Sequence, residues 1–160
     1  MNESFDMVEM KVPARPEYVG VLRLTASGIA SRMGFAYDDI EDIKIALSEA
    51  VTNAVNHAYP DDEHGEIAVA FGIYENRVQI MVSDSGKSFN AKETRQQLGP
   101  YDSSKPVETI TEGGLGLFLI DTLMDEVQIS DQAGVVVSMT KYLQRDEVDQ
   151  SADTQTSKTK

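Results

Sequence analysis

The sequence predicts an α+β fold, a two-layer sandwich in which helices cover one face of a mixed, mostly antiparallel sheet. Two observations favour this class. The strand-like segments follow one another in hairpin order, and the helical segments are grouped between them. The predicted order is strand, helix, helix, strand, strand, long loop, helix, strand, strand. A doubly wound fold would instead alternate strictly between strands and helices, so we do not expect one.

A strand and an apolar helix come first. Residues 5–13 alternate loosely between apolar and polar types and predict the strand. Pro16 stands near the start of a helix that runs to about Met33, where Gly34 is a common stop signal. Arg23 is the only charged residue in the central part of this helix. A helix so apolar is expected to bury one face and offer another to a partner, although core packing alone could explain it.

The second helix extends from Asp38 to about Pro60, and Asp38 and Glu41 have the spacing of a capping box. Apolar and small residues recur along it at helical spacing, which predicts a face packed on the core. These residues are Ile43, Ala46, Leu47, Ala50, Ala54 and Ala58.

The rest of the domain is predicted to be a hairpin, a loop and a strand-rich end. Two strands at 66–75 and 77–84 are joined at Glu75-Asn76. Residues 85–112 lose periodicity, and a loop this long in a compact domain is usually functional or disordered. The segments after it are a helix at 115–125 and strands at 126–131 and 135–143.

Composition indicates one globular domain. The 160 residues are 41% hydrophobic and 26% charged, so we expect a single domain over 1–143. Residues 144–160 are nearly devoid of apolar side chains and are predicted to form a disordered tail. The absence of cysteine excludes disulfides, thiolate metal sites and thiol nucleophiles. Neither a signal peptide nor a membrane span is recognisable, so we expect a cytoplasmic protein.

The net charge is strongly negative. Lys and Arg number 14 against 27 Asp and Glu, a formal charge of −13. Such a surface repels nucleic acid and anionic lipid, so neither is an expected partner. A protein with a basic patch would be attracted, although acidity that only maintains solubility explains the charge equally well.

The second helix carries the first candidate site. Glu49 and Asn53 are four residues apart, so their side chains project along one stripe, which Asn56 and His57 extend. A carboxylate can accept a proton, and a carboxamide oxygen can ligate magnesium. A solvated polar face would also have this pattern, but such a face would more often carry Lys or Glu than an Asn among alanines.

Two further motifs follow at the ends of predicted elements. Asp84 and Gly86 lie where a hydrophobic strand runs into a turn, and an acid there could accept hydrogen bonds from a buried amino group. A plain Asp-x-Gly turn is the alternative. The run from Gly113 to Leu117 enters a helix, where glycines and free amides can approach a phosphate. It is neither a Walker motif nor a dinucleotide fingerprint, and alone it is a generic glycine-rich turn.

The order of these motifs is more specific than any one of them. A helix with Glu-x-x-x-Asn, a strand ending in Asp-x-Gly, a long loop, Gly-x-Gly at a helix and a late strand bearing Thr140 together resemble the ATP site of the superfamily that contains gyrase, the histidine kinases and MutL. The resemblance implies the Bergerat ATP-binding fold, with ATP and Mg²⁺ as ligands.

Three longer segments resemble the anti-sigma-B factors of Gram-positive bacteria: VPARPEYVGVLRL, LSEAVTNAVNHAY and EGGLGLFLIDTLMDEV. The resemblance covers residues 7 to about 143. It implies a dimeric serine-protein kinase that phosphorylates an anti-anti-sigma factor and that otherwise binds and inhibits the stress sigma factor sigma-B.

The resemblance also assigns roles to residues. Glu49 would be the general base or would orient the serine hydroxyl, Asn53 would ligate magnesium, and His57 would contact phosphate. Asp84 would receive the adenine amino group, with Gly86 beside it and Thr140 assisting through water. The phosphate loop would consist of Gly114, Leu115, Gly116 and Leu117, residues 90–112 would form a lid over ATP, and Arg23 would contact the sigma factor.

One departure and two rival functions accompany this hypothesis. Ser88 stands where the superfamily often has a second glycine, so we expect a different loop path there. Histidine kinases usually have Asn at the position of Glu49 and modify a His on a preceding helix, which is not found here. The other rival is a non-catalytic module that sequesters the sigma factor in an ATP-dependent manner, and Glu49 argues against it.

Overall fold

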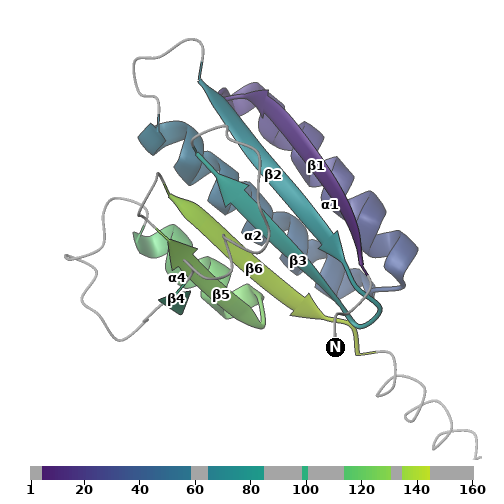
Figure 1. Ribbon diagram of the computed structural model, residues 1–160. Helices are drawn as coiled ribbons and strands as arrows, with labels where there is room; N and C mark the ends of the chain where they lie inside the picture. Colours follow the sequence, from purple (N-terminus) through teal and green to yellow (C-terminus); the bar gives the residue numbers. More distant parts are fainter. Residues whose placement is uncertain (1–4, 59–64, 85–98, 101–113, 131–134, 145–160) are drawn as a thin grey trace, which may run out of the picture.

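The fold is described from a computed structural model, which covers residues 5–58, 65–84, 99–100, 114–130 and 135–144 (Figure 1). The predicted order of helices and strands is confirmed, and one very short strand falls within the segment predicted to be a loop. The elements are β1 (Asp6–Pro13), the 3₁₀ turn η1 (Pro16–Tyr18), α1 (Val19–Met33), α2 (Tyr37–Ala58), β2 (Glu66–Ile73), β3 (Arg77–Ser83), β4 (Gly99–Pro100), α4 (Gly114–Leu123), β5 (Glu126–Ser130) and β6 (Val136–Tyr142).

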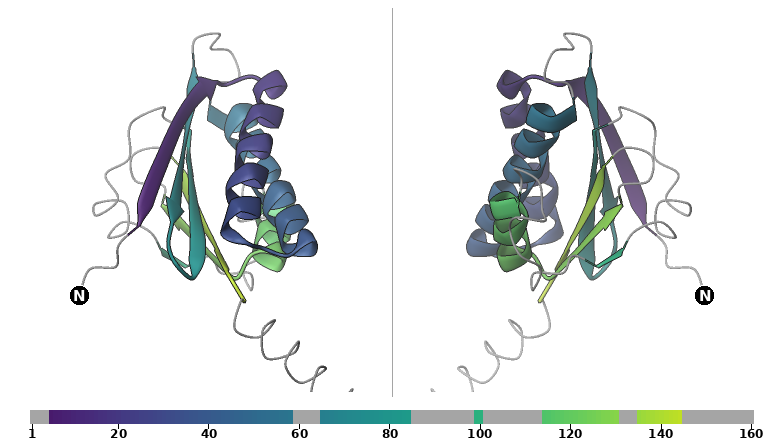
Figure 2. Two further views of the ribbon diagram at one scale, coloured as in Figure 1. Left: turned by 90° about the vertical axis from the view of Figure 1, so that its right-hand side faces the viewer. Right: turned by 90° about the vertical axis from the view of Figure 1, so that its left-hand side faces the viewer.

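One six-stranded sheet carries the described helices α1, α2 and α4 on a single face. The strand order is β1-β2-β3-β6-β5-β4, and the strand pairs among the described residues are all antiparallel. Figure 2 shows the sheet and the three helices as two separate layers. The predicted α+β two-layer class is therefore confirmed. In the described part of the chain, none of the helices has the length and apolar character needed to cross a membrane.

Strand alternation decides which side chains face the helices. On β3, Val78, Ile80 and Val82 belong to the hydrophobic core beneath the helices. Because side chains alternate between the two faces of a strand, the next position on this face is Asp84. The candidate adenine-binding acid thus lies one residue beyond the end of β3 at Ser83.

Helix α1 ends as the sequence predicts. Gly34 adopts a left-handed conformation with φ of 96°, which glycine tolerates best, and its N–H donates to the C=O groups of Ala30 and Ser31. The helix buries Leu22, Ala26 and Ala30, while 72% of the Leu24 surface remains exposed. One face is thus packed on the core and another is open to solvent.

Helix α2 begins one residue earlier than predicted. The N–H of Ile40 donates to the C=O of Ala36, so Ala36 and not Asp38 occupies the N-cap. The capping-box prediction is therefore wrong, and Asp38 and Asp39 instead lie in the first turn, where the helix dipole favours acids. The predicted core face is confirmed for Ile43, Ala46, Leu47 and Ala50, which are buried, and Ala54 packs partly against them.

Candidate functional site

The candidate site lies where α4 packs against α2. A Cβ atom added to Gly116 on α4 would lie 2.7 Å from Nδ2 of Asn53 and 3.3 Å from Oε2 of Glu49. The structure therefore brings together three of the predicted site residues, from segments more than 60 positions apart. Because a Cβ at 2.7 Å would overlap the amide, only glycine fits here without displacing Asn53.

The amide of Asn53 is the most unusual polar group of the site. Its Nδ2 atom is buried and is the one buried side-chain polar atom, among the residues described, that has no hydrogen-bond partner. Leaving a buried donor unsatisfied costs about 1–3 kcal/mol, so such groups are rare and often mark a ligand position. Half a turn about the Cβ–Cγ bond would place Oδ1 there instead, and a carbonyl oxygen suits a hard cation.

Magnesium fits the amide of Asn53. The ion keeps few protein ligands besides water and substrate phosphates, and Asn53 offers an uncharged amide oxygen, with the carboxylate of Glu49 close by. The residues described contain no cluster of three or more His, Cys, Asp or Glu that could bind a metal ion.

Asp84 is held in place by two hydrogen bonds with the backbone of Val135, which precedes β6. Its Oδ1 atom accepts the N–H of Val135 at 3.0 Å, and its own N–H donates to the C=O of Val135 at 3.2 Å. The carboxylate is half-buried and therefore has a defined direction. The sequence reasoning missed Val135, because a backbone contact leaves no signal in the type of residue. Gly86 lies outside the described residues.

The glycine-rich run forms the start of α4. The helix begins at Gly114, so Gly114, Leu115 and Gly116 lie in its first turn. Leu117 is half-buried and packs against the hydrophobic core. The side chains of Leu115 and His57 lie outside the described part of the chain, although both residues belong to helices. Ser88 is outside it too, as is the predicted lid at 90–112 except for β4.

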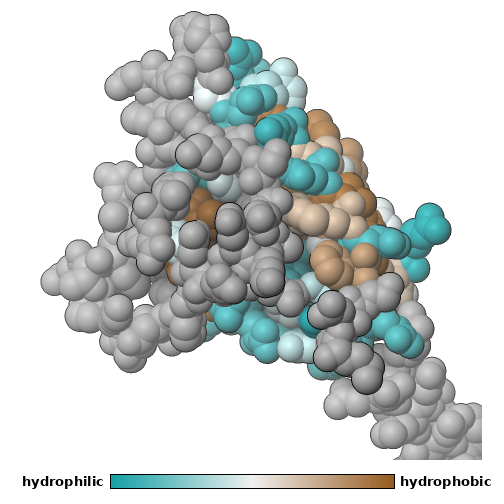
Figure 3. Space-filling model, in the orientation of Figure 1, coloured by the Kyte–Doolittle hydropathy of each residue, from teal (hydrophilic) through white to brown (hydrophobic). Residues whose placement is uncertain are grey.

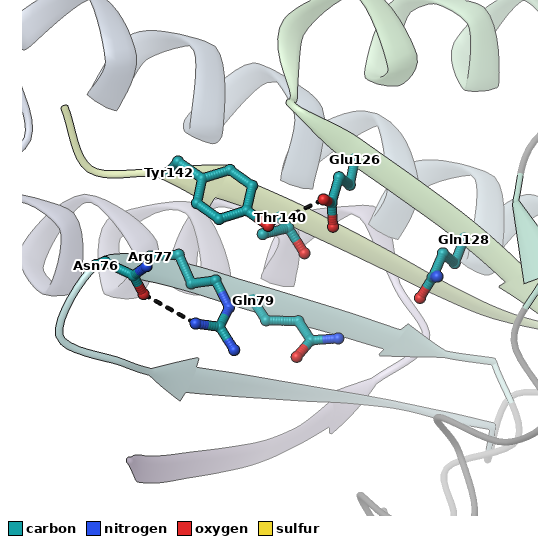
Figure 4. Close-up of a pocket in the computed structure, with 7 residues that line it drawn as sticks. All are labelled: Asn76, Arg77, Gln79, Glu126, Gln128, Thr140 and Tyr142. Carbon is teal, nitrogen blue, oxygen red and sulfur yellow. Dashed lines mark hydrogen bonds between the residues drawn. The ribbon is translucent and has the colours of Figure 1, made fainter. Parts of the chain in front are cut away.

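Thr140 is not brought to this site, and its predicted role beside Asp84 is wrong. It pairs with Gln79 on β3, whereas the β6 residue paired with Ser83, next to Asp84, is Val136. Its neighbours Val137 and Met139 face the core, so Thr140 faces away from the helices. There it lines an open polar pocket formed by Asn76, Arg77, Gln79, Glu126, Gln128, Thr140 and Tyr142 (Figure 4).

Arg23 lies on α1, outside the α2–α4 site. It is exposed, and a Cβ atom added to Gly20 would lie 3.9 Å from its Nη2 atom, so the guanidinium folds back along the helix. Val21 and Leu24 beside it are 45% and 72% exposed. The cation thus sits in an apolar, solvent-facing stretch.

The chain is similar to known proteins over most of its length. The family model of the histidine kinase-like ATPase domain matches residues 12–141. The serine-protein kinase RsbW of Oceanobacillus iheyensis is 57% identical over 94% of this chain and 95% of its own length. RsbW of Bacillus cereus is 60% identical over 93% of this chain and 92% of its own.

A solved structure shows the same fold. The RsbU and RsbW domains of a Mycobacterium tuberculosis protein superpose with a TM-score of 0.60 at 23% identity, over 86% of this chain. This chain spans 32% of the length of that one, and the likeness concerns the fold alone. With a family model that covers most of the chain and relatives of nearly equal length, the chain belongs to the histidine kinase-like ATPase domain family, among the RsbW serine-protein kinases.

Proposed function

We propose that this chain is a serine-protein kinase that transfers the γ-phosphoryl group of Mg-ATP to a serine of an anti-anti-sigma factor. In its other role it binds and inhibits the stress sigma factor sigma-B. The observation that carries the proposal is the close approach of Gly116, at the start of α4, to Asn53 and Glu49. There the buried Nδ2 atom of Asn53 has no hydrogen-bond partner, and the carboxylate of Glu49 lies close by.

Each group of the site matches one part of Mg-ATP. The amide oxygen of Asn53 would hold magnesium, and the backbone amides in the first turn of α4, from Gly114 to Gly116, would receive phosphate oxygens. Asp84 would accept a hydrogen bond from the amino group of adenine, because its carboxylate is held beside the end of β3 by the N–H of Val135. Bound Mg-ATP supplies the phosphoryl group and the positive charge that offsets the negative charge of the phosphates.

Glu49 is the residue that makes the site more than a nucleotide pocket. Its carboxylate would orient the serine hydroxyl of the partner and accept its proton as the serine oxygen bonds to phosphorus and the β–γ bridging oxygen leaves with ADP. Phosphoryl transfer depends mainly on positioning and charge, so the protein needs few other reactive groups.

The partner surface is proposed to centre on Arg23. An exposed cation between Val21 and Leu24 offers both charge and apolar area, the combination common at protein interfaces.

We further propose a homodimer. The β1 edge strand is one candidate surface, because Met7 and Val8 are each 38% exposed there, and Figure 3 shows apolar surface gathered over this side of the sheet. The proposal places the protein in the cytoplasm, without direct contact with nucleic acid or membrane.

The test is phosphorylation of a purified anti-anti-sigma factor with radiolabelled ATP and magnesium. Acid-stable label should appear on the anti-anti-sigma factor, since phosphoserine resists acid. The Glu49→Gln variant, which keeps the size of the side chain, should still bind ATP and sigma factor but lose phosphorylation by at least about 100-fold. Equal labelling by this variant would remove Glu49 from catalysis, and ATP-dependent sigma binding without any label would leave only a sequestering module.

A further inference from the structure

Lys141 joins three elements at the far end of α4. It lies on β6 with only 11% of its side chain exposed. Its Nζ atom donates to the C=O of Leu123, the last residue of α4, at 2.6 Å. The same atom lies 3.6 Å from Oδ2 of Asp42 and 3.8 Å from Oδ1 of Asp39, both on α2.

These contacts suit the groups involved. The last C=O groups of a helix have no partner within the helix and carry the negative end of its dipole, so a lysine there is doubly favourable. Both carboxylates are about a third exposed, at 30% and 35%, while the lysine between them and α4 is nearly enclosed. One ammonium group therefore links the end of α4 to the beginning of α2.

The same stripe of α2 meets α4 at both ends. Glu49 lies seven positions after Asp42 and Asn53 lies eleven positions after it, which is close to two and three helical turns. At one end of the stripe Asn53 and Glu49 lie against Gly116, and at the other end Asp42 reaches Leu123 through Lys141. The position of α4 along α2 is thus fixed at two points.

We infer that Lys141 is a positioning residue for the proposed Mg-ATP site. By holding the end of α4 on α2, it sets how closely Gly116 approaches Asn53 and Glu49. The tolerance is small, since a single added carbon on Gly116 would lie 2.7 Å from the amide of Asn53. The inference rests on the proposed function, because it requires that the α2–α4 contact be the nucleotide site.

The decisive variant is Lys141→Met, which keeps the apolar stem and removes the charge and the donor. We expect its KM for ATP to rise by at least about tenfold, since displacements near 1 Å can cost 100-fold. The KM for the protein substrate should not change. Lys141→Arg should recover most of the ATP affinity because it restores a cation that can donate. The amide NMR signal of Gly116 should shift in Lys141→Met and return toward its original position in Lys141→Arg.

Lys44→Met is the matched control. Lys44 pairs with Glu41 on α2 at 3.3 Å, close to the same acidic turn, and the described contacts of its side chain are all within α2. Its loss should leave the KM for ATP unchanged. If Lys141→Met proves too unstable to assay, Asp42→Asn weakens the same link from α2 and should raise the KM for ATP by a smaller factor.

The outcomes separate this inference from the proposed function. If Lys141→Met, or Asp42→Asn in its place, matches Lys44→Met in KM for ATP, Lys141 has no positioning role and the inference is overturned. If the unmodified protein itself does not bind Mg-ATP, the proposed function fails first.

Discussion

Helices α1 and α2 pack side by side, yet they depart in opposite ways from the usual distribution of apolar side chains inside and polar side chains outside. Helix α2 turns toward α4 a polar stripe that contains Asn53, whose Nδ2 atom is buried without a partner. Helix α1 turns to solvent an apolar stripe in which Val21 and Leu24 are 45% and 72% exposed. A buried polar group is informative, and so is an exposed apolar patch, whereas a single exposed apolar side chain is routine.

The two departures point to two kinds of ligand. A single buried donor beside a glycine can be satisfied by a small polar ligand that enters a packed site. Exposed apolar side chains beside a cation, as around Arg23, instead suit the larger surface of a protein partner. The difference supports the two proposals, Mg-ATP at α2 and a protein partner at α1, and each proposal can be tested separately.

The largest effect is expected from Gly116→Ala. The added carbon would lie 2.7 Å from Nδ2 of Asn53, so the short side chain of Asn53 must leave its position. We expect ATP affinity, measured by titration calorimetry, to fall by at least about 100-fold, while circular dichroism still reports a folded domain.

Gly28→Ala on α1 is the matched control for this glycine. A Cβ atom there would meet nothing within 4 Å, so ATP affinity should be unchanged. The free energy of unfolding should rise by up to about 1 kcal/mol, because alanine is the better helix former. Equal ATP affinities in the two variants would contradict the placement of the site at Gly116.

Asn53→Ala should separate function from stability. Removing a proposed magnesium ligand should lower ATP affinity by about 10–100-fold. The same change removes an unsatisfied buried donor, whose burial costs about 1–3 kcal/mol, and opens only a small cavity. We therefore expect the unliganded variant to unfold at an equal or higher urea concentration than the original protein. A clear loss of stability would show that the amide has a structural partner instead.

Arg23→Ala, on helix α1, should weaken binding of the sigma factor and leave ATP binding unchanged. An anchoring arginine at an interface contributes about 2 kcal/mol or more, so sigma-factor binding should weaken by about 30-fold. ATP affinity should not change, because Arg23 lies outside the α2–α4 contact. Arg32→Ala, also exposed in the last turn of α1, is the control and should leave both affinities intact. A loss of sigma binding of the same size in both variants would indicate general charge attraction.

Local signals in the sequence were sufficient for much of the fold and part of the site. Gly34 ended α1 as predicted, because a left-handed position strongly selects glycine. The spacing of Glu49 and Asn53 placed both on one stripe of α2, and the glycine run placed Gly116 in the first turn of α4. Their meeting could not follow from spacing alone, because it depends on how α4 packs on α2.

Helix ends, very short strands and strand register were harder to predict from the sequence. The start of α2 fell at Tyr37 rather than Asp38, since helix ends depend on local backbone bonds that several acidic residues would permit equally. The two-residue strand β4 is too short to produce a periodic pattern. The role given to Thr140 required the register of β6 against β3, and a shift of one residue in register exchanges the two faces of a strand.

Thr140→Val is therefore expected to have the smallest effect. The substitution keeps the shape of the side chain and removes one hydroxyl from a strand position that faces the polar pocket and not the helices. ATP affinity should be unchanged, and the free energy of unfolding should change by less than about 1 kcal/mol. Asp84→Asn is the positive control, because the carboxylate of Asp84 is the proposed acceptor for adenine and is held by the N–H of Val135. Loss of ATP affinity in Asp84→Asn alone would place the adenine end of the site at the junction of Asp84 and Val135. An equal loss in both variants would instead mean that the nucleotide reaches through to the helix-free face, and the division of roles between the two faces of the sheet would have to be abandoned.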